Sequence, residues 1–187
     1  MKGELYYMKV NKLLWCAALA GTVIASGGSL CAAEQNNKES RGQLGYRDYR
    51  FLSEAAHGGQ MEVRLGEIAK TKANSQAVRD FAQRIITDHS KANDELKQVA
   101  STKGAVIPTE ISRHDNSMTE KLEKLSGRDF DKEYMAAMVK DHKKDVKEFE
   151  DAVKDVTDPD LKAFAQKTLS VIQDHLRVAR EIEASVK

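Results

Sequence analysis

The chain has 187 residues, of which 41% are hydrophobic, and its 30 basic residues are nearly balanced by 29 acidic ones. Both signs are mixed along every segment. The sequence therefore has no basic stripe of the kind that binds nucleic acid, and no polybasic segment that would attract the chain to a membrane surface. This length is enough for one domain with a single core. We expect neither a nucleic-acid-binding protein nor one held electrostatically on a membrane.

The first 33 residues have the pattern of a secretory signal peptide. Three lysines precede an apolar run over residues 13–24, and small residues then lead to Ala33, after which cleavage is most simply placed. The run is too short for a membrane-spanning helix, which needs roughly 20 apolar residues. We expect an exported protein without a transmembrane span in its mature chain, periplasmic or peripheral to the outer membrane. Its start is either Met1 or Met8.

Both cysteines, Cys16 and Cys31, lie within this predicted signal peptide. Cleavage after Ala33 would leave a chain without thiols, which excludes a disulfide, a cysteine nucleophile and a thiolate metal site. A lipid-anchored start at Cys31 is an alternative, although Gly28-Ser29-Leu30 in front of it is a poor lipoprotein signal.

Helical periodicity dominates the rest of the chain. Residues 34–46 are polar and rich in Asn, Gln, Gly and Ser, which predicts a disordered leader. Over residues 47–187 apolar side chains recur at alternating steps of three and four, the spacing of amphipathic helices. Four such stripes predict helices over residues 48–72, 75–103, 129–154 and 161–186. No stretch shows the competing pattern of a β-strand.

Short turns and one long connection determine the expected topology. Asn74-Ser75 and Asp158-Pro159 provide helix N-caps after very short turns, so the helices on either side of each turn should be antiparallel neighbours. The stretch 104–128 is too long for such a turn, and it has a short apolar spacing of its own at Met118 and Leu122. The expected fold is all-α: a ferritin-like antiparallel four-helix bundle of two helical hairpins joined by a long crossover containing a short helix.

The two hairpins share a weak internal sequence similarity, called the echo below. Phe81-Ala82-Gln83-Arg84 in the second helix resembles Phe164-Ala165-Gln166-Lys167 in the fourth, and an Asp-His pair follows each run. The spacing from the phenylalanine to the histidine differs between the two runs. The echo suggests a duplication without establishing it.

Three Asp-His pairs stand in the middle of the helical patterns, at Asp88-His89, Asp141-His142 and Asp174-His175. In each pair the histidine occupies a position where an apolar residue is expected. Counted from the helix ends, the three histidines and Glu62 of the first helix should fall within a layer about 6 Å thick. One glutamate and three histidines from four helices form a ligand set that Fe, Mn, Zn or Cu could accept.

Two interpretations of this layer remain open. Each aspartate is rotated about 100° around the helix from the histidine that follows it. Asp88 and Asp174 could therefore orient a metal-bound histidine of an adjacent helix, with Tyr134 as a further supporting residue. Alternatively, the histidines and carboxylates form a metal-free network of buried hydrogen bonds that holds the helices in register.

The region from about Tyr46 to Lys187 resembles an exported bacterial family called domain of unknown function 4142, whose members are often labelled predicted outer membrane proteins. The features that carry the resemblance are Phe51 with Ala55-Ala56 and Gly59, Glu62 with Leu65-Gly66 and Ala69, Phe81-Ala82 before Asp88-His89, Leu125-Ser126-Gly127 with Phe130-Asp131 and Tyr134, His142, and Asp158-Pro159 through His175-Leu176. The resemblance implies a ferritin-like fold and little about activity. Amphipathic helices are neither barrel strands nor membrane spans, so the outer-membrane label conflicts with the sequence.

The departure from ferritin-like di-metal enzymes bears on function. Those enzymes carry Glu-x-x-His on two helices, whereas Ile86 and Ile172 stand three residues before His89 and His175 here. A carboxylate-bridged di-iron oxidase is therefore poorly supported. We expect an exported binding or stress-related envelope module. Its cofactor is undetermined, with a transition metal as the candidate, and enzymatic activity is undetermined but less favoured than binding. A metal-dependent oxidase using the same layer and a metal-free interaction scaffold are the alternatives, and an envelope protein or a second copy of the chain could be a partner.

Overall fold

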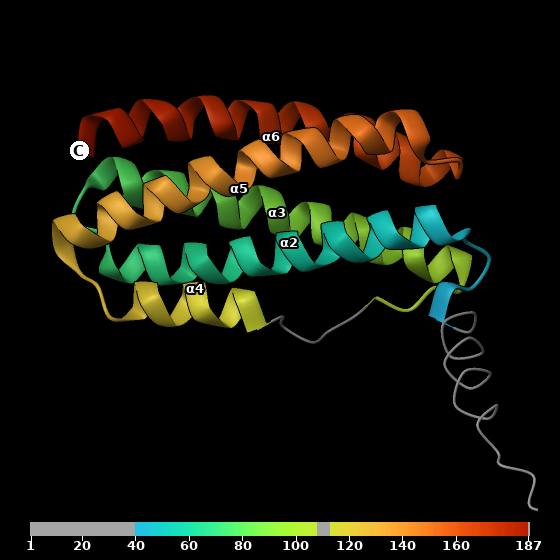
Figure 1. Ribbon diagram of the computed structural model, residues 1–187, viewed down its shortest axis with the longest axis horizontal. Coiled ribbons are helices and arrows are strands. Elements are labelled where there is room, and N and C mark those ends of the chain that lie inside the picture. Colours follow the sequence, from blue (N-terminus) through green and yellow to red (C-terminus); the bar gives the residue numbers. More distant parts are fainter. Residues whose placement is uncertain (1–39, 108–112, 187) are drawn as a thin grey trace, which may run out of the picture.

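The computed structural model describes residues 40–107 and 113–186 (Figure 1). Within these residues the regular elements are helices: α2 (Tyr46–Lys72), α3 (Gln76–Lys103), α4 (Arg113–Glu123), α5 (Gly127–Asp155) and α6 (Pro159–Val186). The four long helices agree with the four amphipathic stripes to within a few residues at each end. The predicted signal peptide over residues 1–33 lies outside the described residues.

The four long helices form an antiparallel bundle of two hairpins. A short turn joins α2 to α3 and another joins α5 to α6, while α3 packs beside α6 and α2 beside α5. Helix α4, which lies between α3 and α5 in the sequence, runs alongside the bundle and packs against α2 and α5 (Figure 1). The predicted all-α, ferritin-like bundle with one long crossover containing a short helix is confirmed.

Each tight turn is bound by an aspartate from the opposite hairpin. Asp48, near the start of α2, accepts hydrogen bonds from both backbone N–H groups of Thr157-Asp158 (2.9 and 3.0 Å) and from the Thr157 hydroxyl (2.8 Å). Asp131, near the start of α5, accepts the backbone N–H groups of Asn74-Ser75 (3.0 and 2.8 Å). Both carboxylates are buried. The two hairpins are therefore tied together at both ends of the bundle.

The helix caps follow the sequence in one case and depart from it in the other. Asp158 caps α6 as expected, since its Oδ1 accepts the N–H groups of Asp160 and Leu161, both at 3.1 Å. Ser75 stands at the N-cap of α3, but its side chain makes no capping hydrogen bond. Its own N–H donates to Asp131 instead, a contact between residues far apart in the chain.

Residues 40–45 are ordered, which differs from the disordered leader expected through residue 46. The Leu44 side chain is buried in the core. The Gln43 N–H donates to the Lys103 carbonyl (2.9 Å), and the Val106 N–H donates to the Ser40 carbonyl (2.8 Å). This segment therefore covers the C-terminal end of α3, where unpaired carbonyls need donors. One apolar side chain and these backbone partners outweigh the polar composition.

The apolar core is divided into two clusters. The cluster nearer the α2–α3 turn includes Leu65, Val78, Ile85, Phe130 and Met138. The cluster nearer the α5–α6 turn includes Phe51, Leu96, Phe149, Leu161 and Phe164, with the Phe51 and Phe149 rings edge to face at 5.1 Å between centroids. Between the two clusters the core turns polar, because Glu62, His89, His142 and His175 are buried there.

Small residues let α2 approach α3 closely beside this polar layer. A Cβ atom on Gly66 would lie 2.8 Å from Ile86 Cγ1 and 3.2 Å from the Ala82 carbonyl oxygen. A Cβ atom on Gly59 would collide with the side chain of Asn93, whereas one on Gly58 would meet open space. Close contact at Gly59 and Gly66, on either side of Glu62 in the sequence, brings that carboxylate to α3.

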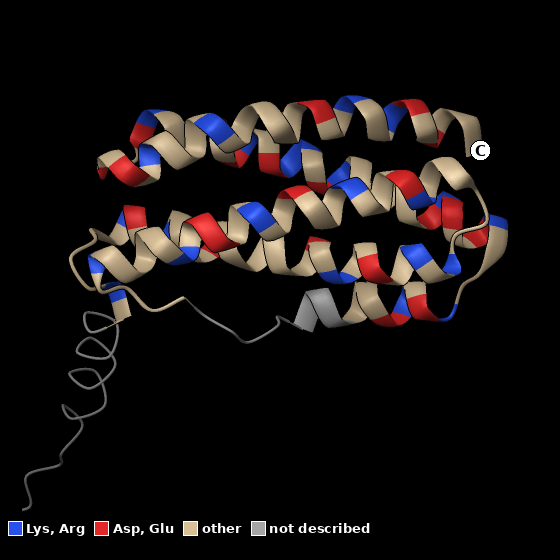
Figure 2. Cartoon of the chain, turned by 180° about the vertical axis from the view of Figure 1, so that it is seen from behind, with Lys and Arg blue, Asp and Glu red and all other residues tan. Residues whose placement is uncertain are grey.

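The outer faces of the helices carry mixed charges. Figure 2 shows basic and acidic residues interspersed along the helices. Many pair within one helix, as Lys147 does with Asp151 and Arg177 with Glu181, both at 2.8 Å. None of the described helices combines the length and the apolar character that a membrane crossing needs.

Candidate metal centre

Glu62, His89, His142 and His175 meet in the middle of the bundle, one from each long helix. His142 and His175 are fully buried, and Glu62 and His89 retain only 2% and 6% of their surface. The three imidazole centroids lie 5.8, 5.3 and 5.4 Å apart. The structure thus brings together the four residues that helix counting places in one layer.

His89 donates a hydrogen bond to Glu62 across the α2–α3 interface. The distance from His89 Nδ1 to Glu62 Oε2 is 2.8 Å, and an ionised carboxylate can only accept. The other ring nitrogen, His89 Nε2, is buried and has no hydrogen-bond partner within the described part of the chain. This second nitrogen is therefore available to a ligand.

A backbone carbonyl determines the tautomer of His142. Its Nδ1 lies 3.0 Å from the Met138 carbonyl oxygen, one turn earlier in α5. Since a carbonyl can only accept, Nδ1 carries the proton and Nε2 keeps its lone pair. Glu62 Oε1 also lies 3.4 Å from this Nδ1, but the proton is directed to Met138, and Oε1 accepts no hydrogen bond from the described residues.

Asp88 holds His175 across the α3–α6 interface. The distance from His175 Nε2 to Asp88 Oδ2 is 2.8 Å, so Nε2 donates and Nδ1 keeps its lone pair. Arg84 lies next to Asp88, with 3.4 Å between Arg84 Nε and Asp88 Oδ2, and reaches Asp174 with Nη2 at 2.6 Å. Asp88 therefore orients a histidine of the adjacent helix.

The unprotonated nitrogens of His142 and His175 face each other. His142 Nε2 lies 3.4 Å from His175 Nδ1, and in each ring the other nitrogen already donates its proton elsewhere. Two lone pairs at this distance repel each other unless a proton or a cation lies between them. One ligand atom from each of the three histidines lies within 4.8 Å of the other two. A metal bound by all three histidines would need each nitrogen at about 2.0–2.1 Å from it.

Charge is distributed unequally over the layer. Burial opposes ionisation of Glu62, but the charges of His89 and His142 outweigh burial and lower its pKa to about 2. Burial is likewise outweighed at His89, whose pKa is raised by Glu62. Burial lowers the pKa of His142, and it lowers the pKa of His175 to about 4 despite the hydrogen bond that His175 donates to Asp88. The layer therefore favours an ionised Glu62 beside His89, whose protonated form is favoured, and neutral forms of His142 and His175. A metal at His89 Nε2 would displace the proton from that nitrogen.

Two of the expected supporting residues make no hydrogen bond to a histidine within the described part of the chain. The Asp174 carboxylate pairs with Arg84 and Arg177 on the surface, because its side chain is rotated about 100° away from that of His175. Tyr134 is buried and stacks on Phe130 at 5.6 Å. Its hydroxyl finds no hydrogen-bond partner among the described residues. Neither residue makes a hydrogen bond to an imidazole among the described residues.

Three contributors to the site were not assigned from the sequence: Arg84, the Met138 carbonyl and Asp145. A signal existed for Arg84, which stands four residues before Asp88 on the same helix face, and for Asp145, which stands three residues after His142. Ligand atoms of Asp145, Glu62 and His142 lie within 4.8 Å of one another. Burial, followed by the charges of Glu62 and Glu148, raises the pKa of Asp145 to about 9.

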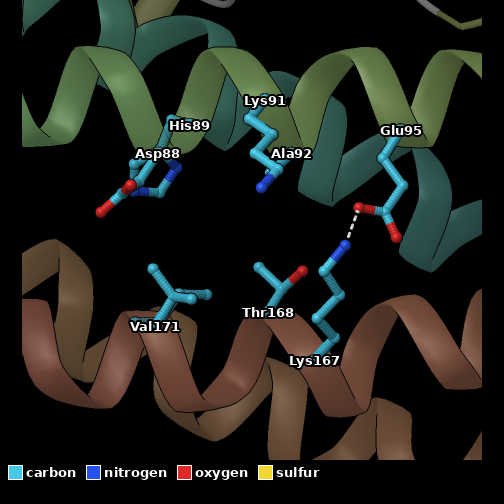
Figure 3. A pocket seen from close by; sticks show the side chains of 9 residues that line it. Asp88, His89, Lys91, Ala92, Glu95, Lys167, Thr168 and Val171 are labelled. Atoms are coloured by element: carbon cyan, nitrogen blue, oxygen red, sulfur yellow. Dashed lines mark hydrogen bonds and ion pairs between the residues drawn. The ribbon is translucent and has the colours of Figure 1, made fainter.

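A cleft of about 120 Å³ opens between α3 and α6 and reaches His89 (Figure 3). Lys91 of α3 and Thr168 of α6 line its middle, and an ion pair between Glu95 and Lys167 crosses it. In this view His89 lies next to Asp88, at the opposite end of the cleft from Glu95 and Lys167. Space accessible to small molecules thus extends to one edge of the buried layer.

The bundle is similar to solved structures at low sequence identity. A DUF305 fragment from Deinococcus radiodurans aligns with a TM-score of 0.69 and 12% identity, over 76% of this chain and 98% of that one. A DUF305 protein from Streptomyces coelicolor, described as secreted, aligns with a TM-score of 0.66 and 16% identity, over 74% and 91% of the two chains. CopM in its Cu(II)-bound form aligns with a TM-score of 0.65 and 16% identity, over 75% and 97%. At these identities the likeness shows the fold alone.

The sequence itself matches one family. No curated protein matches the chain. Residues 33–182 match the family described as Domain of unknown function (DUF4142), a span that includes every residue of the polar layer. This agrees with the resemblance carried by residues such as Phe51, Glu62 and Asp88-His89. The chain therefore belongs to the DUF4142 family.

Proposed function

We propose that this protein is an exported transition-metal-binding protein whose ligands are His89, His142 and His175. The observation that supports the proposal is the set of hydrogen bonds around these rings. Three different acceptors, Glu62, the Met138 carbonyl and Asp88, each bind one ring nitrogen. The other nitrogen of each ring is left for a ligand, and metal-binding histidines in proteins are oriented in this way.

The donor set favours Cu(II) or Zn(II). Three imidazole nitrogens suit these metals better than Mn(II) or Fe(II), which rank lower in affinity for such sites. Glu62, one of the four residues expected as ligands, acts here as the acceptor for His89, and its negative charge partly balances that of a bound cation. One protein with the same fold, CopM, has been solved in a Cu(II)-bound form, so copper is the first metal to test.

A binding role fits the site better than turnover. Bound copper or zinc would supply Lewis acidity, and copper would also supply one-electron redox capacity. The protein's own residues hold the metal away from solvent, since two of the three ligands are fully buried. The cleft beside His89 is the side from which an external molecule could approach. We infer capture or buffering of metal in the cell envelope, with an oxidase using the same layer as the second candidate.

Metal analysis of the exported protein tests this function. The untagged full chain would be expressed in a bacterial host and purified from the periplasm, and N-terminal sequencing would check cleavage after Ala33. Elemental analysis and Cu(II) electron paramagnetic resonance should then show about one metal per chain with nitrogen couplings. His89→Gln with His175→Gln should abolish binding, whereas His57→Gln, which removes a histidine outside the layer, should retain it.

The opposite result has a clear meaning. A folded protein that takes up none of Cu(II), Zn(II), Fe(II) or Mn(II) at the histidines would reject the metal proposal. The hydrogen bonds that His89 donates to Glu62 and that His175 donates to Asp88 would then hold the helices in register within a metal-free scaffold.

A further inference from the structure

A second cleft, of about 300 Å³, lies between α2 and α5 on a different face of the polar layer. Five carboxylates line it, those of Glu54, Glu62, Asp141, Asp145 and Glu148, and the one lysine among its lining residues is Lys144. The cleft is therefore strongly acidic. Such a surface attracts cations but does not by itself hold one at a defined place.

Glu62 is the residue that turns this acidic surface into a defined site. Its side chain is 97% buried, and one oxygen, Oε2, is bound to His89. The other oxygen, Oε1, accepts no hydrogen bond from the described residues, because the neighbouring His142 Nδ1 donates to the Met138 carbonyl. An ionised oxygen that is buried without a partner is costly, and a cation would remove that cost.

Asp145 supplies the second oxygen ligand. It stands on α5 opposite Glu62, and ligand atoms of Glu62, Asp145 and His142 lie within 4.8 Å of one another. His142 can contribute little here, since the nitrogen nearer to Glu62 Oε1, Nδ1, carries the proton that it donates to the Met138 carbonyl. The protein ligands are then two carboxylates, and the open cleft admits water to the remaining positions. Oxygen ligands with several waters are typical of hard divalent cations such as Mn(II) and Mg(II).

We propose that Glu62 and Asp145 hold a hard divalent cation at the floor of the α2–α5 cleft, in a site separate from the three histidines. The two sites share Glu62, which gives one oxygen to His89 and the other to this cation. Their ligands otherwise differ, so each site can fail without the other.

Manganese(II) is the probe for this site, because it is paramagnetic and prefers oxygen ligands. Titrated into the purified full-length protein at pH 8, Mn(II) should broaden the amide NMR signals around Glu62 and Asp145 in a saturable way. Asp145→Asn should weaken Mn(II) binding about tenfold or more. Asp94→Asn, which changes an exposed aspartate of α3 paired with Lys97, should leave it unchanged.

Two outcomes would overturn the proposal: broadening that does not saturate, or equal Mn(II) affinity in the wild type and Asp145→Asn. Circular dichroism checks that each variant is folded, and Asp145→Asn should fold because asparagine has nearly the same shape and removes one carboxyl from a crowded acidic group. His175→Gln separates the two sites, since it removes a ligand of the tri-histidine site only. Retained Mn(II) binding together with lost Cu(II) or Zn(II) binding in that variant is the expected pattern. Loss of both in His175→Gln would reject a separate site.

Discussion

The chemistry of the polar layer depends on which nitrogen of each histidine carries the proton. Glu62, the Met138 carbonyl and Asp88 settle this for His89, His142 and His175 respectively. A neutral imidazole with one hydrogen-bonded nitrogen offers a single lone pair in a fixed direction. The acceptors therefore determine whether the histidines can share a cation. Glu62 and Asp88 each lie on a helix next to that of their histidine, whereas the Met138 carbonyl lies one turn back on the helix of His142 itself.

At the scale of one residue, His175 should make the metal-free protein sensitive to mild acid. Its pKa is about 4 in the folded chain against 6.5 for an ordinary histidine. Between these values the unfolded chain binds a proton that the folded chain does not. Above about pH 6.5 His175 therefore does not change the free energy of unfolding. As the pH drops below that value the free energy of unfolding falls, by about 3 kcal/mol in total once the pH is below about 4.

Urea unfolding in the presence of a chelator, repeated from pH 7.5 to pH 4, measures this effect. Over that window the wild type should lose more stability than His175→Gln, by up to about 3 kcal/mol at the acid end. The reason is that glutamine can still donate to Asp88 but does not titrate, while every other titrating group is common to both proteins. The low pKa of Glu62 adds its own loss only below about pH 4.5. Parallel pH profiles for the two proteins would contradict the assignment to His175.

At the scale of elements, the two hairpins depend on aspartates that act at a distance. Asp131→Ala should lower the free energy of unfolding by about 2–3 kcal/mol, because it leaves the N–H groups of Asn74-Ser75 without their acceptor. Asp94→Ala on the exposed face of α3 should change it by less than about 0.5 kcal/mol. Chemical denaturation of the three proteins checks this, and equal stabilities would show that the turn does not need Asp131.

Close packing of α2 on α3 gives a second prediction at this scale. Gly66→Ala should destabilise the protein by about 1–3 kcal/mol, since its Cβ would press on Ile86 and on the Ala82 carbonyl. Gly58→Ala, where a Cβ meets nothing within 4 Å, should be neutral or stabilise by up to about 1 kcal/mol through helix propensity. Thermal unfolding of both variants provides the measurement. A stable Gly66→Ala protein would mean that the two helices can separate without cost.

The whole molecule has an approximate internal symmetry that the polar layer breaks. One constant separation along the chain relates Asp48 to Asp131, the turn Asn74-Ser75 to Thr157-Asp158, and Phe81 to Phe164. The paired aspartates make equivalent contacts with the opposite turns, so the echo seen in the sequence has a structural counterpart. The histidines do not obey this relation. The scaffold therefore repeats, whereas the candidate site belongs to the assembled bundle as a whole.

At this scale, a metal bound by all three histidine-bearing helices should stabilise the whole bundle. Free Cu(II) or Zn(II) at about a hundred times Kd should add about 2.7 kcal/mol, which corresponds to a rise in Tm of roughly 5–10 °C for a domain of this size. Differential scanning calorimetry with and without chelator checks the effect. The His89→Gln/His175→Gln variant should show no such rise, and an equal rise in that variant would place the metal elsewhere.

Local patterns in the sequence were sufficient to predict the helices, the hairpin turn capped by Asp158 and the crossover. They also predicted that Glu62, His89, His142 and His175 lie at the same level along the bundle axis. The reason is that helical period, capping and rise per residue act over a few neighbouring positions. Only the tertiary structure decided that Asp88 binds His175 while Asp174 does not, that Asp131 and Asp48 hold distant turns, and that Asp145 lies beside Glu62. Those contacts depend on how each helix is rotated about its axis and on which helices become neighbours. The packing of the two apolar clusters determines both, because it joins residues that are far apart in the chain.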